Sequence, residues 1–151
     1  MNNFESITQF INKSPKTELH LHIEGSLEPN LMFKLSQRNK VEIPFKSVEE
    51  IRSAYNFTNL DSFLNIYYQG SNVLINDEDF FDLTWEYILR CKQDNIVHTE
   101  IFFDPQSHLP RGVSFDAIIN GIDKALQKAK NEFNISSKVI MCFLRHLDEE
   151  S

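Results

Sequence analysis

The residues whose types and spacing point most directly to chemistry are His20 and His22, which one leucine separates. Residues i and i+2 of a strand face the same side, so both imidazoles can bind one metal ion. A turn at Gly25 follows, and in parallel α/β folds ligands bind where the strands end. Zinc sites use three or four ligands, so two strand histidines that only pack or hydrogen-bond are the open alternative.

An acidic residue, Glu24, follows His22 at the same two-residue spacing. It stays on the side of the two histidines if the strand geometry continues. A carboxylate there can accept a hydrogen bond from a substrate or orient a metal ligand. The alternative is an acidic loop residue that contacts only solvent.

A second expected strand, residues 96–103, carries its polar side chains on one parity, namely His98 and Glu100, with Asp104 just beyond the strand. The residues between them are apolar or threonine, so we expect that other face to lie under helices. A glutamate within a strand is costly unless it is paired. Glu100 is therefore expected to have a bonding partner or a place near a metal ligand.

Polar residues also follow the ends of the second and third expected strands. The run Asp-Pro-Gln-Ser-His at 104–108 comes after the second strand, where it forms either a plain turn or a loop facing the site. The third strand ends in Arg145 and His146. Polar residues at three strand ends form a more specific pattern than any one of them.

The elements that would position these residues alternate along the chain. Hydrophobic periodicity and capping residues predict strands at 17–22, 96–103 and 137–147, and helices at 4–11, 28–38, 61–75, 77–93 and 115–133, with a further helix start at 47–50. This order predicts an α/β fold, the first three βα units of a TIM-type (β/α)8 barrel with extra helices between strands one and two. A small open parallel sheet is the alternative. Because a complete barrel needs about 250 residues, we expect a truncated one.

The composition excludes several other classes of protein. The chain has 151 residues, with 15 Lys and Arg against 22 Asp and Glu, a net charge of −7. This length fits one domain over residues 1–151, here an incomplete one, and the acidic balance argues against nucleic-acid and anionic-membrane partners. Two cysteines cannot build a disulfide framework, and the first residues lack a signal peptide, so we expect a cytoplasmic protein.

Four stretches resemble one known family, the adenosine/adenine deaminases of the amidohydrolase superfamily. They are TELHLHIEGSLEP at 17–29, NVLI at 72–75, HTEIFFDPQSH at 98–108 and KVIMCFLRH at 138–146. Together they make the resemblance cover nearly the whole chain after residue 16. The glutamate at position 24 and the run at 104–108 are most similar to the adenine-specific members. The adenosine enzymes usually have aspartate where this chain has Glu24.

The resemblance implies a β/α barrel that holds one Zn²⁺ and converts adenine and water to hypoxanthine and ammonia in purine salvage. It implies His20 and His22 as two metal ligands, and as substrate-binding residues Glu24, Ser107 and His108. It also implies that four further residues either line the pocket or support the metal ligands, namely Glu100, Asp104, Arg145 and His146. Glu24 would lie beside the purine and exclude ribose.

The family's remaining catalytic groups cannot be placed on this chain. Its third histidine ligand, its aspartate ligand, its catalytic glutamate and the histidine that orients water all lie on later strands. We therefore expect no catalytic residue within residues 1–151, weak zinc binding and no adenine turnover by this chain alone, and a need for the rest of the barrel or a partner chain. The alternatives are an adenosine deaminase and a non-catalytic truncated module.

Overall fold

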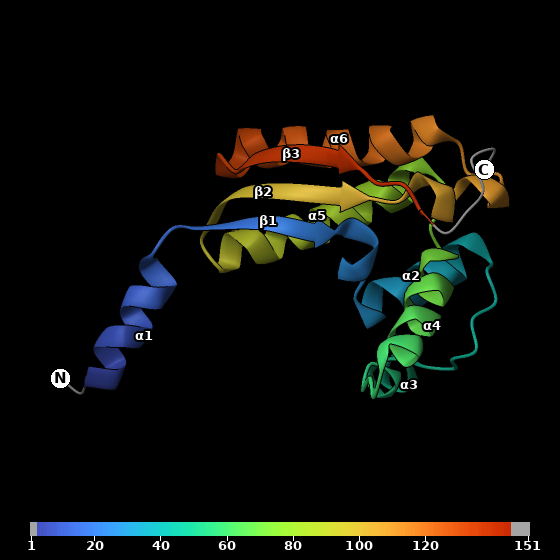
Figure 1. Ribbon diagram of the computed structural model, residues 1–151, viewed down its shortest axis with the longest axis horizontal. Helices are drawn as coiled ribbons and strands as arrows, with labels where there is room; N and C mark the ends of the chain where they lie inside the picture. The colour runs from blue at the N-terminus through green and yellow to red at the C-terminus, as the bar shows by residue number, and fades with distance from the viewer. Residues whose placement is uncertain (1–2, 146–151) are drawn as a thin grey trace.

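A parallel sheet of three strands forms the centre of the computed structural model, which describes residues 3–145 (Figure 1). The strands are β1 (Lys16–His22), β2 (Ile96–Phe103) and β3 (Ser136–Met141), and they pair in the order β1-β2-β3. Both neighbouring pairs are parallel. Each connection between strands therefore crosses over through helices, as the sequence predicts.

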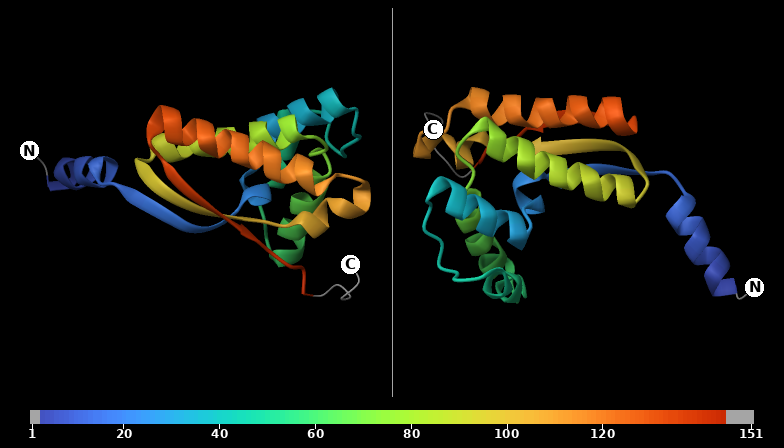
Figure 2. Two further views of the ribbon diagram at one scale, coloured as in Figure 1. Left: turned by 90° about the horizontal axis from the view of Figure 1, so that it is seen from above. Right: turned by 180° about the vertical axis from the view of Figure 1, so that it is seen from behind.

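Six α-helices accompany the strands in the described part of the chain. They are α1 (Asn3–Lys13), α2 (Pro29–Asn39), α3 (Val48–Ala54), α4 (Leu60–Ser71), α5 (Asp77–Gln93) and α6 (Phe115–Phe133). Figure 2 shows α5 and α6 side by side over one face of the sheet, while α2, α3 and α4 form a layer at the carboxyl end of β1. The predicted barrel units with extra helices between strands one and two are confirmed. None of the helices within residues 3–145 is long and apolar enough to cross a membrane.

The regular alternation of side chains expected of a strand is interrupted at the centre of β1. β1 pairs Glu18 with Thr99 and Leu21 with Ile101, so three steps on β1 oppose two steps on β2. An extra residue of this kind reverses which side the following residues face. Glu18 consequently points to α5, where Tyr87 donates a hydrogen bond to it, and Leu19 is exposed. His20 and His22 still lie on one side of the sheet, since the rings of both contact Phe102.

The third strand is shorter than predicted. It ends at Met141 rather than at residue 147, because its partner β2 ends at Phe103. The backbone N–H of Cys142 still donates to the Phe103 carbonyl at 2.9 Å, but the next backbone bond, from Leu144, goes to the side chain of Gln106. The residues from 142 to 145 therefore form a loop over the carboxyl end of the sheet.

The core lies between the sheet and helices α5 and α6. Thr99, Ile101 and Phe103 of β2 point into it, as the parity of the sequence predicts, and all three are buried. The two helices pack closely at Gly121 of α6, where an added Cβ would lie 2.7 Å from the Cβ of Phe80. Real Cβ atoms do not approach that closely, so this contact requires glycine.

Substituting Gly121 with alanine is expected to lower the free energy of unfolding by about 1–3 kcal/mol, the usual cost of overpacking a well-packed core. Backbone atoms of α5 are among the neighbours, so the helices must move apart. Urea unfolding measures the difference. The control is Asn120→Ala on the exposed side of α6, which should leave stability unchanged or slightly higher. Equal stability of the two variants would contradict the close packing.

Candidate functional site

Two hollows lie at the carboxyl end of the sheet, where the sequence places its polar strand ends. The larger one, here called the histidine cleft, has a volume of about 660 Å³. Its walls include His20, His22, Phe102, Asp104 and Arg145. The loop after β3 and helix α4 complete the cleft, so it collects residues from all three strand ends.

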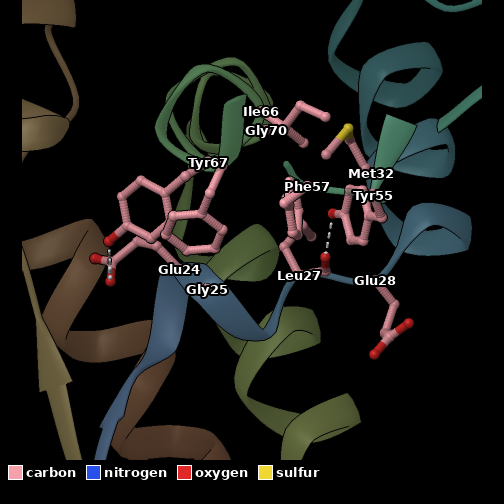
Figure 3. A pocket seen from close by; sticks show the side chains of 11 residues that line it. Glu24, Gly25, Leu27, Glu28, Met32, Tyr55, Phe57, Ile66, Tyr67 and Gly70 are labelled. Carbon is pink, nitrogen blue, oxygen red and sulfur yellow. Dashed lines mark hydrogen bonds between the residues drawn. The ribbon is translucent and has the colours of Figure 1, made fainter. Parts of the chain in front are cut away.

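The smaller hollow, here called the aromatic pocket, has a volume of about 210 Å³ (Figure 3). It lies between α4 and the turn after β1. The hydroxyl of Tyr67 and the carboxylate of Glu24 meet at one end, and at the other Tyr55 donates a 2.7 Å hydrogen bond to the carbonyl of Leu27. Tyr67 and Gly25 line both hollows, so the two are neighbours with a shared wall.

The histidine pair is held by contacts with strand β2. The ring centroids of His20 and His22 are 5.7 Å apart, and both rings contact Phe102. Nδ1 of His22 lies 2.9 Å from Oδ2 of Asp104. Because a carboxylate only accepts hydrogen bonds, Nδ1 is the protonated nitrogen and Nε2 keeps a free lone pair. That lone pair is what a metal ion requires of a histidine ligand.

The donor set of the histidine cleft fits a zinc ion. Zinc binds imidazole nitrogen and carboxylate oxygen, and a carboxylate on the other ring nitrogen is the usual support of a zinc-bound histidine. His22 has such a support in Asp104, and His20 presents a second imidazole to the same cleft. Within the described residues these two histidines present imidazole nitrogens to the cleft from one strand.

A third ligand type, the thiol of Cys142, lies close to this pair. One ligand atom each of His22, Asp104 and Cys142 lies within 4.8 Å of the others. Burial, together with the carboxylates of Asp104 and Glu24, raises the pKa of the Cys142 thiol. The thiol of Cys142 thus lies beside His22 and Asp104 as a third type of donor atom in the cleft.

Glu24 has its carboxylate inside the protein, with 3% of the residue exposed. Its Oε1 accepts from the backbone N–H of Asp104 at 3.0 Å and lies 3.2 Å from Nε2 of His108. Its Oε2 lies 3.4 Å from the hydroxyl oxygen of Tyr67. The carboxylate thus lines the aromatic pocket, next to Tyr67 of the shared wall, and it is not the solvated loop acid of the alternative interpretation.

Tyr67 connects the two carboxylates. Its hydroxyl donates to Oδ2 of Asp104 at 3.0 Å, closer than its contact with Glu24. Burial and the neighbouring carboxylates raise the pKa of Tyr67 far above its ordinary value, so the hydroxyl keeps its proton. The network therefore runs without a break from His22 through Asp104 and Tyr67 to Glu24.

His108 and Ser107 line neither hollow. The side chain of His108 is fully buried behind Glu24, with its ring edge against Phe80. The hydroxyl of Ser107 is buried with no hydrogen-bond partner among the described residues. The structure thus places His108 next to a predicted substrate residue rather than in the cleft itself.

The other predicted positions differ in their distance from the histidine cleft. Arg145 is exposed and lines it. Glu100 is half-exposed, lies 3.7 Å from Nε2 of His98 and lines neither hollow. The side chain next to Glu100 is therefore His98 of the same strand, and no residue of either hollow. His146 lies outside the residues that the structure describes.

Two members of this network are not predicted by the sequence. Tyr67 belongs to a run of aromatic residues in α4 that periodicity assigns to helix packing, although such a residue can also line a pocket. Arg111 follows the 104–108 run with no motif around it, yet its guanidinium lies 2.7 Å from Nδ1 of His108. Only the folded arrangement brings them to Glu24.

The sequence and the fold both match known proteins. A family model described as adenosine deaminase matches residues 15–151, so the chain belongs to the adenosine deaminase family. Among curated relatives, the adenine deaminase of Psychrobacter cryohalolentis is 63% identical over 140 residues, 93% of this chain and 42% of the relative. The adenine deaminase of Wolinella succinogenes is 63% identical over 144 residues, 95% of this chain and 44% of the relative.

Solved structures show the same fold. The crystal structure of an adenine deaminase from Arthrobacter aurescens has a TM-score of 0.85 at 43% identity, covering 90% of this chain and 42% of that chain. An amidohydrolase from Burkholderia ambifaria, solved with bound Zn, has a TM-score of 0.80 at 21% identity and covers 94% of this chain and 39% of that chain. The chain thus spans less than half the length of these relatives.

Proposed function

We propose that the protein, in its complete form, is an adenine deaminase that hydrolyses free adenine to hypoxanthine and ammonia with one bound Zn²⁺. The observation that carries this proposal is the histidine cleft, in a chain 63% identical to proteins named adenine deaminase. His20 and His22 would hold the ion through their free imidazole nitrogens. A zinc ion bound there lowers the pKa of a coordinated water, so that hydroxide is available near neutral pH.

The chain's own residues prepare this site. Asp104 accepts the Nδ1 proton of His22 and fixes the ring in the tautomer that leaves Nε2 free. Tyr67 donates to the same carboxylate oxygen and limits its rotation. The ring of Phe102 packs against both imidazoles and holds them in the cleft. Each of these contacts reduces the reorganisation needed when the ion binds.

The substrate side of the site is assigned to Glu24, with Ser107 and His108 supporting it. Free adenine carries an N–H on its five-membered ring where adenosine carries the ribose. A buried carboxylate accepts a hydrogen bond from that N–H, and its desolvated charge is left without this partner when a sugar replaces the hydrogen. Glu24 is also long enough to occupy the space of the sugar. Both effects favour the free base.

The remaining groups of the reaction are assigned to chain beyond residue 151, or to a partner chain. A deaminase needs a proton donor for the ring nitrogen and further metal ligands. Asp104 is the carboxylate that lines the described cleft, and it is already bonded to His22 and Tyr67, so it is not available as the proton donor. This assignment agrees with a chain that spans 42–44% of its relatives.

Asparagine in place of Asp104 is expected to weaken zinc binding by about 10- to 100-fold, the usual cost of removing the carboxylate behind a metal-bound histidine. The amide keeps the size of the side chain but can present its N–H₂ to Nδ1 and stabilise the wrong tautomer. Competition with a zinc chelator measures the affinity. The control is Asp123→Asn on the exposed face of α6, which should bind zinc as the wild type does. An unchanged affinity in the Asp104 variant would remove this role.

The function is tested on the protein expressed from its complete reading frame and supplied with zinc. We expect kcat/KM for adenine to exceed that for adenosine by at least about 100-fold. Glu24→Asp should reduce this preference, because the shorter side chain leaves room for ribose. The control is Glu132→Asp on α6, which should keep it. A preference for adenosine would assign the protein to the other branch of the family, and no turnover of either purine would favour the non-catalytic module.

A further inference from the structure

Arg111 lies outside both hollows, yet it is bonded to the network behind Glu24. It ends a short 3-10 helix, Leu109–Arg111, and its guanidinium donates to the carbonyls of Ser71 at 3.0 Å and Asn72 at 3.1 Å. These carbonyls close the end of α4, the helix that carries Tyr67. Arginine at the last carbonyls of a helix is a common structural contact. A further contact gives this one an additional role.

The same guanidinium also determines which ring nitrogen of His108 carries the proton. Nη2 of Arg111 lies 2.7 Å from Nδ1 of His108. A guanidinium has only donors, so Nδ1 must be the bare, accepting nitrogen. The proton of the neutral ring is therefore on Nε2, which faces Oε1 of Glu24 at 3.2 Å. The opposite tautomer would place two donors face to face at Nδ1 and two acceptors face to face at Nε2.

Among the residues that the structure describes, the ring nitrogens of His108 have no hydrogen-bond partners other than Arg111 and Glu24. The side chain is fully buried, and its ring and that of Phe80 lie at right angles with centroids 5.0 Å apart. Oε1 of Glu24 receives a second hydrogen bond from the backbone N–H of Asp104. Oε1 thus has two hydrogen-bond partners inside the protein. Oε2 has a single contact, 3.4 Å from the hydroxyl of Tyr67.

We propose that Arg111 is a positioning residue for substrate recognition, which acts by locking His108 in its Nε2–H tautomer and thereby fixing the rotation of the Glu24 carboxylate. Oε2 is then the oxygen presented to the N–H of a free purine base. This inference rests on the proposed function only in its last step. The tautomer and the orientation of Glu24 follow from the contacts of this chain.

The tautomer is measured directly by ¹⁵N NMR of the histidine side chains, since protonated and bare ring nitrogens have well-separated shifts. The signal of His108 is identified by its loss in His108→Gln. We expect a single neutral tautomer with the proton on Nε2 in the wild-type protein. A proton on Nδ1, or a mixture of the two forms, would overturn the proposal independently of any activity measurement.

Kinetics of the complete protein distinguish positioning from a purely structural role. His108→Leu removes the hydrogen bonds that link Arg111 to Glu24 through His108, but it keeps the Arg111 bonds to α4. His108→Gln instead offers an oxygen to Arg111 and an N–H to Glu24. The leucine variant should raise KM for adenine about 10- to 100-fold, the loss of one hydrogen bond to a charged group, with kcat changed much less. The glutamine variant should have a KM for adenine much closer to that of the wild type. Equal KM values for wild type and His108→Leu would overturn the proposal. If the wild type does not deaminate adenine, the proposed function fails and the NMR result still decides the role of Arg111.

Discussion

Replacing His22 with alanine is expected to lower kcat/KM for adenine by about 10³-fold or more in the complete protein and to remove most of the bound zinc. His22 is the imidazole whose tautomer is fixed, because Asp104 holds its Nδ1 at 2.9 Å. A metal ion supplies several kcal/mol of transition-state stabilisation, and each 1.36 kcal/mol is a factor of ten in rate. Steady-state kinetics and metal analysis of the purified variant measure both effects.

The matched control for this variant is His98→Ala. His98 is also a strand histidine with its Nδ1 in a hydrogen bond, here to the hydroxyl of Ser136 at 2.7 Å, but it lines neither hollow. Its loss should leave zinc content unchanged and activity within a few-fold. If the two variants lose activity equally, the histidines act through folding rather than through a metal ion. Full zinc content in the His22 variant would exclude it as a ligand.

The second large effect is expected on stability, from Asp79→Ala. Asp79 is 0% exposed and lies in the first turn of α5. Oδ2 accepts from the backbone N–H groups of Ile75 and Asn76 and from the side-chain amide of Asn39, and Oδ1 pairs with Arg38 of α2. Truncation leaves several donors without an acceptor, so the free energy of unfolding should fall by about 3–5 kcal/mol.

Urea unfolding of the wild type and the variant measures this difference. The control is Asp77→Ala, which removes an exposed acid of the same helix turn that pairs with Lys124 at 2.7 Å. Solvent screens an exposed ion pair, so this control should unfold nearly as the wild type does. A loss of similar size in both variants would contradict the role of the buried carboxylate. It would mean that helix-end charge, rather than the bonds of Asp79 to α2, stabilises this region.

Much of the secondary structure is predictable because the signals are local. The β2 strand and helix α5 begin and end within a residue or so of their predicted bounds, since Asn76 and Asp77 mark the start of α5 and alternation marks β2. The end of β3 is not predictable in this way. It depends on where β2 stops supplying partners, a property of a strand about 40 residues away.

The site is predictable only in part for the same reason. His20 and His22 stand out by spacing, and family resemblance adds Glu24 and Asp104. Tyr67 and Arg111 carry no motif. The role of Tyr67 arises from contacts across 37 and 43 residues of chain, with Asp104 and Glu24. Arg111 lies only three residues from His108, but its role depends on the long-range contact of His108 with Glu24. The extra residue in β1 is likewise visible only in its pairing with β2.

If His20 and His22 hold a zinc ion in the histidine cleft, an anomalous difference map collected at the zinc absorption edge from crystals of the complete protein locates it. We expect one peak in the cleft, bonded to a ring nitrogen of His20 and to Nε2 of His22, with Asp104 still on Nδ1. A peak bonded instead to Asp104 and Cys142, or no peak in zinc-saturated crystals, would contradict this assignment.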